Sequence, residues 1–188
     1  SNIGTSGYFI IGSEYITIEG NDKTVTIDNV QNYPGLIQNG INGSVAFTYI
    51  TINNIGIVSS GSTTLVDYGG WLCQTYFGNQ ISNGTLTIQN CYSTGAISGE
   101  LSGGICGNVY GIFASGGTFE VNNCYSNGTI KGGFSGGICG ASYGEFSSGT
   151  LIIENCYSTG TISGGKSGGI CGEAYGIFTN GGTKTIQN

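Results

Sequence analysis

The sequence predicts an all-β protein, a right-handed single-stranded parallel β-helix with coils of about 33 residues. One observation is a run of alternating apolar and polar residues that recurs at Leu86–Cys91, Phe119–Cys124 and Leu151–Cys156. Another is the punctuation between runs, where most of the 38 glycines lie and where tight corners need positive φ. A fixed period of this length is typical of a solenoid, in which each unit buries its apolar face against its neighbours.

The elements follow in order from these runs. Residues 1–20 are expected to form an N-terminal entry or cap segment, and residues 21–188 the β-helix repeats. Less regular copies lie at 25–30 and 50–55, and another begins at 184–188. The single proline, Pro34, lies outside them, as expected for strands in a continuous ladder. We expect the solenoid to continue past Asn188, in the same polypeptide or by stacking on another copy.

An asparagine closes each run. These residues are Asn29, Asn54, Asn90, Asn123, Asn155 and Asn188. Asparagine tolerates a left-handed corner, and its amide can donate to one neighbour and accept from the other. We therefore expect an asparagine ladder, stacked at about 4.8 Å, with a structural role.

The cysteines form two columns. One follows the Gly-Gly pairs, at Cys73, Cys106, Cys139 and Cys171; the other follows the asparagines, at Cys91, Cys124 and Cys156. Forward pairing gives disulfides Cys73–Cys91, Cys106–Cys124 and Cys139–Cys156, and leaves Cys171 over. We favour this pairing because the columns then begin together. Pairing in the other direction, as in Cys91–Cys106, and reduced core thiols stay open as alternatives. Spacings of 15 and 18 residues without histidine do not fit a structural zinc site.

The segments Asn90–Gly95 and Ser102–Gly107 resemble the Cys- and Gly-rich β-helix repeats of predicted proteins from giant viruses related to mimiviruses. They are similar, more distantly, to the GLUG repeats of bacterial surface proteins. The resemblance covers about residues 8–188. It implies a surface or fibre protein with a right-handed β-helix, and it transfers no catalytic residue.

Aromatic residues form three further columns. These are Tyr92, Tyr125 and Tyr157; Phe77, Tyr110, Tyr143 and Tyr175; and Phe113, Phe146 and Phe178. Stacked rings usually reflect packing, and we expect the phenylalanine column in the core. An exposed tyrosine column would offer a platform for sugars, since tyrosine has an apolar face and a polar tip.

Charge excludes several partners. With four lysines, no arginine and a net charge of −6, the chain lacks the basic footprint that nucleic acid requires. No apolar stretch approaches the roughly 18 residues of a membrane span, so we expect no membrane insertion. No signal peptide is visible, and any targeting segment is expected outside this chain.

An enzyme is not expected, and no cofactor is implied. The sequence has no histidine and no arginine, which are the usual base and carboxylate clamp. Asp28 and Glu154 are the acidic residues at the position before the asparagine, and four coil steps would separate them by roughly 19 Å, too far for a glycosidase pair. The acidic residues Glu14, Glu19, Asp22 and Asp28 favour a solvated cap over a calcium site. A threonine array for ice binding is interrupted at Glu120 and Ile152.

Three Asn-Gly-Ser/Thr sequons, at Asn42, Asn83 and Asn127, are expected in outer corners where a glycan fits. The sequence thus predicts a structural fibre or surface protein, extracellular or on a virion, that self-associates head to tail. The alternative is a carbohydrate-binding adhesin module, and a polysaccharide-active enzyme comes third.

Overall fold

The computed structural model describes residues 7–177 and 181–188, and it is a parallel β-solenoid of about five turns with a repeat of about 33 residues. The predicted fold class is confirmed. Its strands are β1 (Phe9–Ile10), β2 (Thr17–Asp28), β3 (Ile37–Gln38), β4 (Ile50–Ser60), β5 (Thr85–Gln89), β6 (Tyr92–Ser93), β7 (Thr118–Asn122), β8 (Tyr125–Ser126), β9 (Thr150–Glu154), β10 (Tyr157–Ser158) and β11 (Lys184–Gln187).

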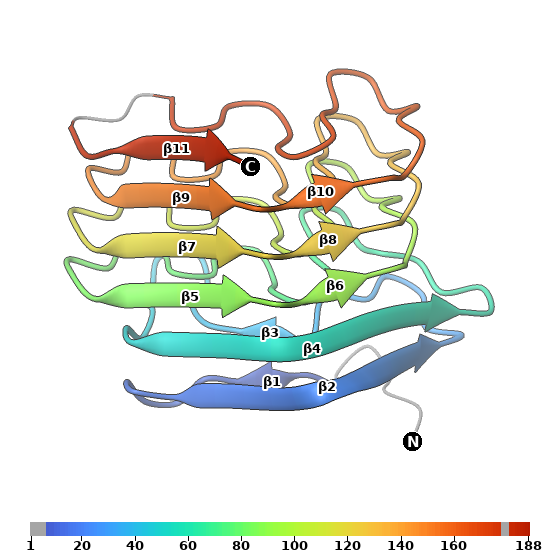
Figure 1. The fold of residues 1–188 in the computed structure, drawn as a ribbon, viewed down its shortest axis with the longest axis horizontal. Coiled ribbons are helices and arrows are strands. Elements are labelled where there is room, and N and C mark those ends of the chain that lie inside the picture. The colour runs from blue at the N-terminus through green and yellow to red at the C-terminus, as the bar shows by residue number, and fades with distance from the viewer. Residues whose placement is uncertain (1–6, 178–180) are drawn as a thin grey trace.

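One continuous parallel sheet forms the front of the solenoid (Figure 1). β2 pairs with the long strand β4, which then pairs with both β5 and β6. From there two columns of strands rise side by side, β5, β7, β9 and β11 in one and β6, β8 and β10 in the other. Each later coil therefore reproduces β4 as two shorter strands, separated by a corner.

Alternation explains why these segments are strands. In β5, Leu86 and Ile88 are fully buried, whereas Thr85, Thr87 and Gln89 are half-buried on the outer face. The register stacks like on like, with Leu86 beside Phe119 and Ile88 beside Val121. Because successive side chains point to opposite faces of each strand and the coils are in register, the buried side chains form one apolar interior along the axis.

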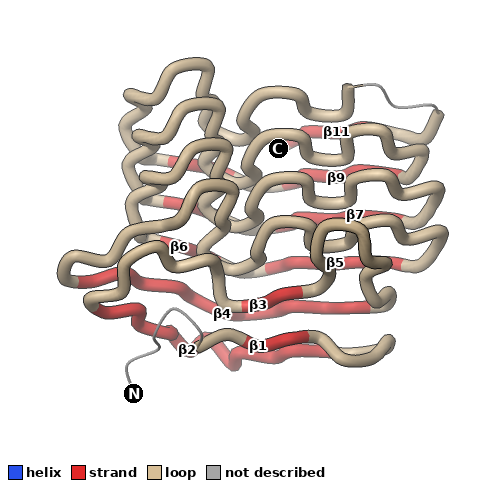
Figure 2. The backbone as a smooth tube through the Cα atoms, turned by 180° about the vertical axis from the view of Figure 1, so that it is seen from behind, coloured by secondary structure: helices blue, strands red, loops and turns tan. Residues whose placement is uncertain are grey.

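Beyond the paired strands β1 and β3, the rear of the solenoid consists of turns joined by isolated parallel bridges (Figure 2). Gly103 bridges to Gly136 and Cys106 to Cys139, so the Gly-Gly-Ile-Cys motif marks the same place in successive coils. A Cβ on Gly103 would lie 1.9 Å from the carbonyl oxygen of Cys106, a distance no side chain tolerates. Glycine is required there because the backbone folds back on itself.

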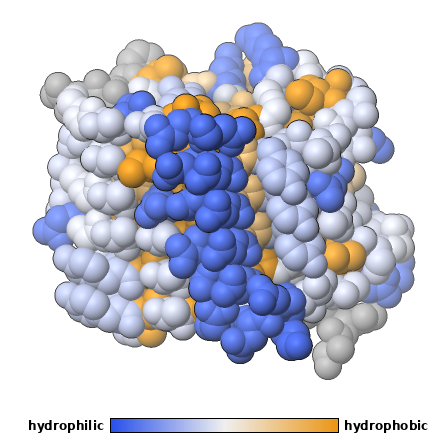
Figure 3. All heavy atoms as spheres, in the orientation of Figure 1, coloured by the Kyte–Doolittle hydropathy of each residue, from blue (hydrophilic) through white to orange (hydrophobic). Residues whose placement is uncertain are grey.

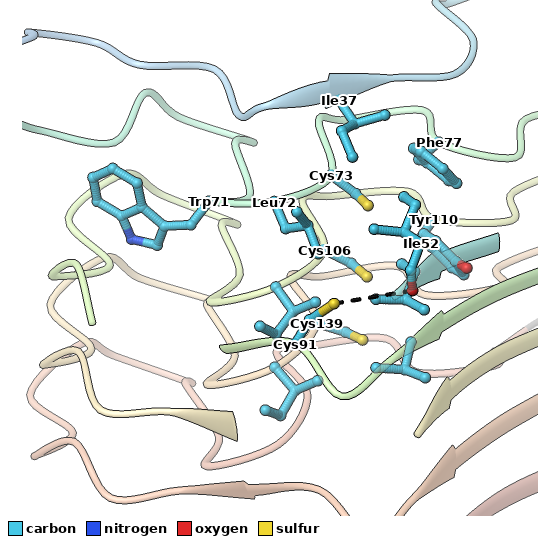
Figure 4. Close-up of a cluster of buried hydrophobic side chains, with 14 of the residues drawn as sticks. Ile37, Ile52, Trp71, Leu72, Cys73, Phe77, Cys91, Cys106, Tyr110 and Cys139 are labelled. Carbon is cyan, nitrogen blue, oxygen red and sulfur yellow. Dashed lines mark hydrogen bonds between the residues drawn. The ribbon is translucent and has the colours of Figure 1, made fainter. Parts of the chain in front are cut away.

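Aromatic, aliphatic and cysteine side chains fill the interior (Figure 4). Phe77, Tyr110, Tyr143 and Tyr175 stack in succession, with ring centroids 5.6, 5.0 and 5.5 Å apart. This column supports the predicted packing role.

The first coil departs from the predicted register. Glu19 pairs with Asn53, a register shift follows between Glu19 and Lys23, and Asp28 lies beside Ser60. Parallel pairing already includes β1 and the start of β2, so the predicted entry segment 1–20 contributes strands to the solenoid. Residues 25–28 of the predicted run at 25–30 form the end of the long strand β2, and Asn29 and Val30 follow it.

Candidate functional site

The asparagine column lies on the outer surface. Asn54, Asn90, Asn123 and Asn155 have φ of 56°, 53°, 51° and 51°, the left-handed corner that the sequence predicts. Asn90, Asn123, Asn155 and Asn188 are exposed and Asn54 is half-buried. Among the described residues, the corner asparagines do not hydrogen-bond to one another as the predicted ladder requires: the amide of Asn54 donates to Glu19 at 2.9 Å, and that of Asn90 donates to Asn53, the residue before the corner, at 3.0 Å. An outward corner explains this, because the exposed amides point to solvent and to neighbouring outer side chains rather than to one another.

Asn29 does not belong to this column. It lies beside Gly61, and its Oδ1 accepts the backbone N–H of Ser62 at 3.2 Å. Asn21, with φ of 51°, has the left-handed conformation at the corresponding corner of the first coil. Asn21 precedes Asn54 by 33 residues, so the period alone could have identified it.

The side chains before and at these corners form the amide stripe. It comprises Glu19, Asn53, Asn54, Gln89, Asn90, Asn122, Asn123, Glu154, Asn155 and Gln187. Figure 3 shows it as a hydrophilic band over the ends of β5, β7, β9 and β11. The amide of Gln187 donates to Glu154 at 2.8 Å, and that of Asn53 to Glu19 at 2.7 Å. The pKa of Glu19 is lowered chiefly by the hydrogen bond from the backbone N–H of Asn21, and then by those from the amides of Asn54 and Asn53.

The internal polar column is built from serine, which the sequence reading missed. The backbone N–H of Ser102 donates to Ser135 Oγ at 3.1 Å, and that of Ser135 to Ser167 Oγ at 3.1 Å. Ser102 and Ser135 are fully buried. Their Ser-Gly-Gly motif recurs with the same period, so a search for buried polar columns would have found them.

The predicted disulfides are not formed. All seven cysteines are free: Cys73, Cys91, Cys106, Cys124, Cys139, Cys156 and Cys171. The sulfurs of Cys73, Cys106 and Cys139 lie one above another in the core, with Cys91 in a separate position (Figure 4). In the second column, each thiol donates to the backbone carbonyl two residues before it. The sulfur-to-oxygen distances are 3.1 Å for Cys91 to Gln89, 3.2 Å for Cys124 to Asn122 and 3.2 Å for Cys156 to Glu154. Reduced core thiols, the alternative left open, describe the structure. Burial raises the pKa of the Cys106 and Cys139 thiols.

The tyrosine column is stacked on the outer face of β6, β8 and β10. Ring centroids are 5.0 Å apart between Tyr92 and Tyr125, and 5.1 Å apart between Tyr125 and Tyr157. Because each inner ring face is covered by the next ring, a sugar cannot lie flat on it. The column offers ring edges and hydroxyl groups along its length, and an open ring face only at Tyr157, which is 49% exposed.

The phenylalanine column was placed wrongly in the core. Phe113 and Phe146 stack at 5.3 Å but are 50% and 47% exposed. Both have left-handed backbones at an outer corner, which turns their side chains away from the interior. Phe178 lies outside the described residues.

The other predicted positions lie apart from one another. Asn42, Asn83 and Asn127 are exposed in turns, as the sequons require, while glycosylation stays a prediction. The acidic residues do not converge: Glu14 accepts from Thr48, and Asp28 from Ser60 and Asn29. Residues 7–177 and 181–188 contain no group of three or more potential metal ligands.

One cleft combines polar and aromatic groups. A cavity of about 280 Å³ is lined by Asp67, Tyr68, Thr75, Tyr76 and Asn108, and we call it the Tyr68 cleft. Two corners of one coil form its walls, and the N–H of Asn108 from the next coil donates to the Tyr68 carbonyl at 2.9 Å. None of its residues recurs with the period, so the repeat pattern does not indicate the cleft.

Comparison of the chain with protein-family models, with curated proteins and with solved structures finds no match. The resemblance to giant-virus and GLUG repeats therefore stays a prediction. In the residues that the structure describes, no helix is long and apolar enough to cross a membrane.

Proposed function

We propose that the protein is a rigid structural component of an extracellular or virion surface, in which solenoids stack end to end into a fibre. The observation that carries the proposal is the sheet running without interruption from β2 to β11. Within the described residues, the outer edges of these two strands have no partner strand. Unpaired N–H and C=O groups along such an edge are a template for another parallel strand.

Both ends of the solenoid also expose apolar side chains. At one end, Ile153, Ile170 and Ile186 line a cavity of about 390 Å³, and Ile186 is 49% exposed. At the other end, a cavity of about 350 Å³ is lined by residues of β1 and β2, including Phe9 and Ile10, which are 58% and 67% exposed. Apolar surface at both ends favours stacking, because contact would remove it from water.

We commit to a second copy of this chain as the occupant. The first strand of that copy, β2, is 12 residues long and has the parallel direction needed to continue the β11 ladder. A head-to-tail contact of this kind does not close into a ring, so repetition produces a filament.

A catalytic role is not part of the proposal. The acidic residues of the front face serve the amide network instead: Glu19 accepts from Asn53 and Asn54, Glu120 from Asn122, and Glu154 from Gln187. Glu19 and Glu154 are separated by four coil steps, or roughly 19 Å.

The test is the state of association of the chain as a function of concentration, measured by sedimentation and negative-stain electron microscopy. Rods that lengthen with concentration are expected. Ile186→Lys places a charge on the end and should block growth, whereas Ile152→Lys, on the outer face of β9, should not. A wild-type chain that stays monomeric at its highest soluble concentration, or rods that form equally in Ile186→Lys, would overturn the proposal.

A further inference from the structure

At the Tyr68 cleft, equivalent positions of successive coils carry side chains of different chemistry on the same backbone. Tyr68 corresponds to Leu101, Phe134 and Lys166, and all four have left-handed φ, between 55° and 68°. A left-handed corner favours glycine or asparagine, so the backbone does not explain a large side chain there.

The opposite wall varies in the same way. Thr75 corresponds to Asn108, Ala141 and Glu173. In the last coil the two walls meet, because Lys166 and Glu173 form an ion pair at 3.6 Å across the equivalent positions. In the coil of Tyr68 the walls stay apart, and a cavity of about 280 Å³ opens between them.

The Asn108 side chain supplies hydrogen-bond donors at the cleft. Asn108 is only 8% exposed, and its Oδ1 accepts the backbone N–H of Val109 at 2.9 Å. Its Nδ2 donates to no group in the described part of the chain, although the residue lines the cleft. The Nδ2 is accessible from the cavity that Asn108 lines, so its two N–H groups can donate to a bound ligand.

Acceptors and an apolar surface lie beside these donors. One oxygen of Asp67 accepts the backbone N–H of Glu100 at 2.9 Å, and the other is available. Thr75 donates to the Asn108 carbonyl at 3.2 Å and keeps its lone pairs. Tyr68 is 48% exposed and Tyr76 half-buried, so both have accessible ring surface.

We propose that the Tyr68 cleft binds a neutral saccharide. A pyranose has hydroxyl groups that both donate and accept, and a C–H face that packs on an aromatic ring, matching the carboxylate, the amide and the tyrosines. A cation held by the two tyrosines and Asp67 is the competing ligand, but a cation cannot use the Asn108 donors. The Asp67 carboxylate disfavours acidic sugars. This activity goes beyond the structural function and does not depend on it.

The test is a glycan array carrying neutral and sialylated oligosaccharides, followed by saturation-transfer NMR with glucose, galactose, mannose, N-acetylglucosamine and choline. Neutral sugars are expected to bind. Tyr68→Leu and Asn108→Ala copy the residues that the next coil carries, Leu101 and Ala141, so both variants should fold. Each variant should raise the dissociation constant about tenfold, because stacking or hydrogen bonds are lost. Phe134→Leu, the matched control two coils away, should leave it unchanged.

Three outcomes would overturn the proposal. One is binding of choline alone, which would make the cleft an aromatic site for cations. Another is the absence of binding to any probe. The third is sugar binding that neither cleft variant weakens, which would place the sugar elsewhere, for example on the open face of Tyr157.

Discussion

The hydroxyl of Ser135 accepts the backbone N–H of Ser102 at 3.1 Å and lies 3.0 Å from the carbonyl of Gly99, to which it donates. One buried side chain thus satisfies two backbone groups of the preceding coil. The same geometry is repeated by Ser167, which accepts from Ser135 and donates to Gly132. This column holds the rear turns in register where regular strands are missing.

Replacing Ser135 with alanine should destabilise the solenoid, because the buried N–H of Ser102 loses its acceptor. We expect a loss of about 1–3 kcal/mol in the free energy of unfolding, measured by urea denaturation. Ser115→Ala, at an exposed serine, is the control and should change it far less. Equal midpoints for the two variants would contradict a structural role for the serine column.

The asparagine corners should depend on backbone conformation rather than on the amide. Asn123 is exposed, has φ of 51°, and makes no side-chain hydrogen bond among the described residues. Asn123→Gly should therefore be tolerated, whereas Asn123→Ala should cost about 1 kcal/mol through left-handed strain. Thermal unfolding of the two variants provides the measurement. If glycine were as harmful as alanine or more so, the amide itself would be the stabilising group.

The thiols should be reduced and protected. Six cysteines are buried and Cys171 is half-buried, so a thiol reagent at neutral pH should label Cys171 first. The other six should react only when the chain unfolds. Peptide mapping without reductant checks the same point, and a peptide linking Cys106 to Cys124 would restore the disulfide hypothesis.

Alkaline pH should unfold the protein. Burial raises the pKa of Cys73, Cys106 and Cys139 above the ordinary value of 9.0, and that of Tyr110 and Tyr143 above 10.0. These groups ionise more readily in the unfolded chain. Their contribution to the free energy of unfolding is therefore complete below about pH 9. Above that pH it is lost, by about 1.4 kcal/mol per pH unit for each group.

The measurement is the urea midpoint between about pH 8 and about pH 11. Cys139→Ala removes one ionising group and should reduce the slope, although it lowers stability at neutral pH by leaving a cavity. A midpoint that does not change over this range would contradict the burial of neutral thiols and phenols.

Regular repetition made the fold predictable from the sequence. The runs ending at Asn90, Asn123 and Asn155 have the right strands, register and corners because period and alternation act together. The first coil was misread, because the register shift after Glu19 has no counterpart in later coils. The direction in which a side chain points from a corner was also missed, as Phe113 shows, since spacing does not distinguish inside from outside at a left-handed residue.

The cysteine pairing and the Tyr68 cleft needed three-dimensional distances. Separation along the chain could not tell Cys106–Cys124 from two independent columns of thiols. The cleft depends on a space left open between two corners, and Tyr68 and Asn108 belong to no repeated motif.

Equivalent residues of successive coils lie directly beside one another, as in the pairs Tyr92–Tyr125 and Tyr125–Tyr157, whose rings stack 5.0 and 5.1 Å apart. A coil gained or lost by unequal recombination between repeats would shift every coil above it by one step and keep each column of equivalent residues continuous. Every surface feature would stay in its own column of equivalent residues. Length in such a chain can therefore change over evolutionary time independently of what each side displays, and a duplicated coil would align its copy of the Tyr68 cleft directly above the original.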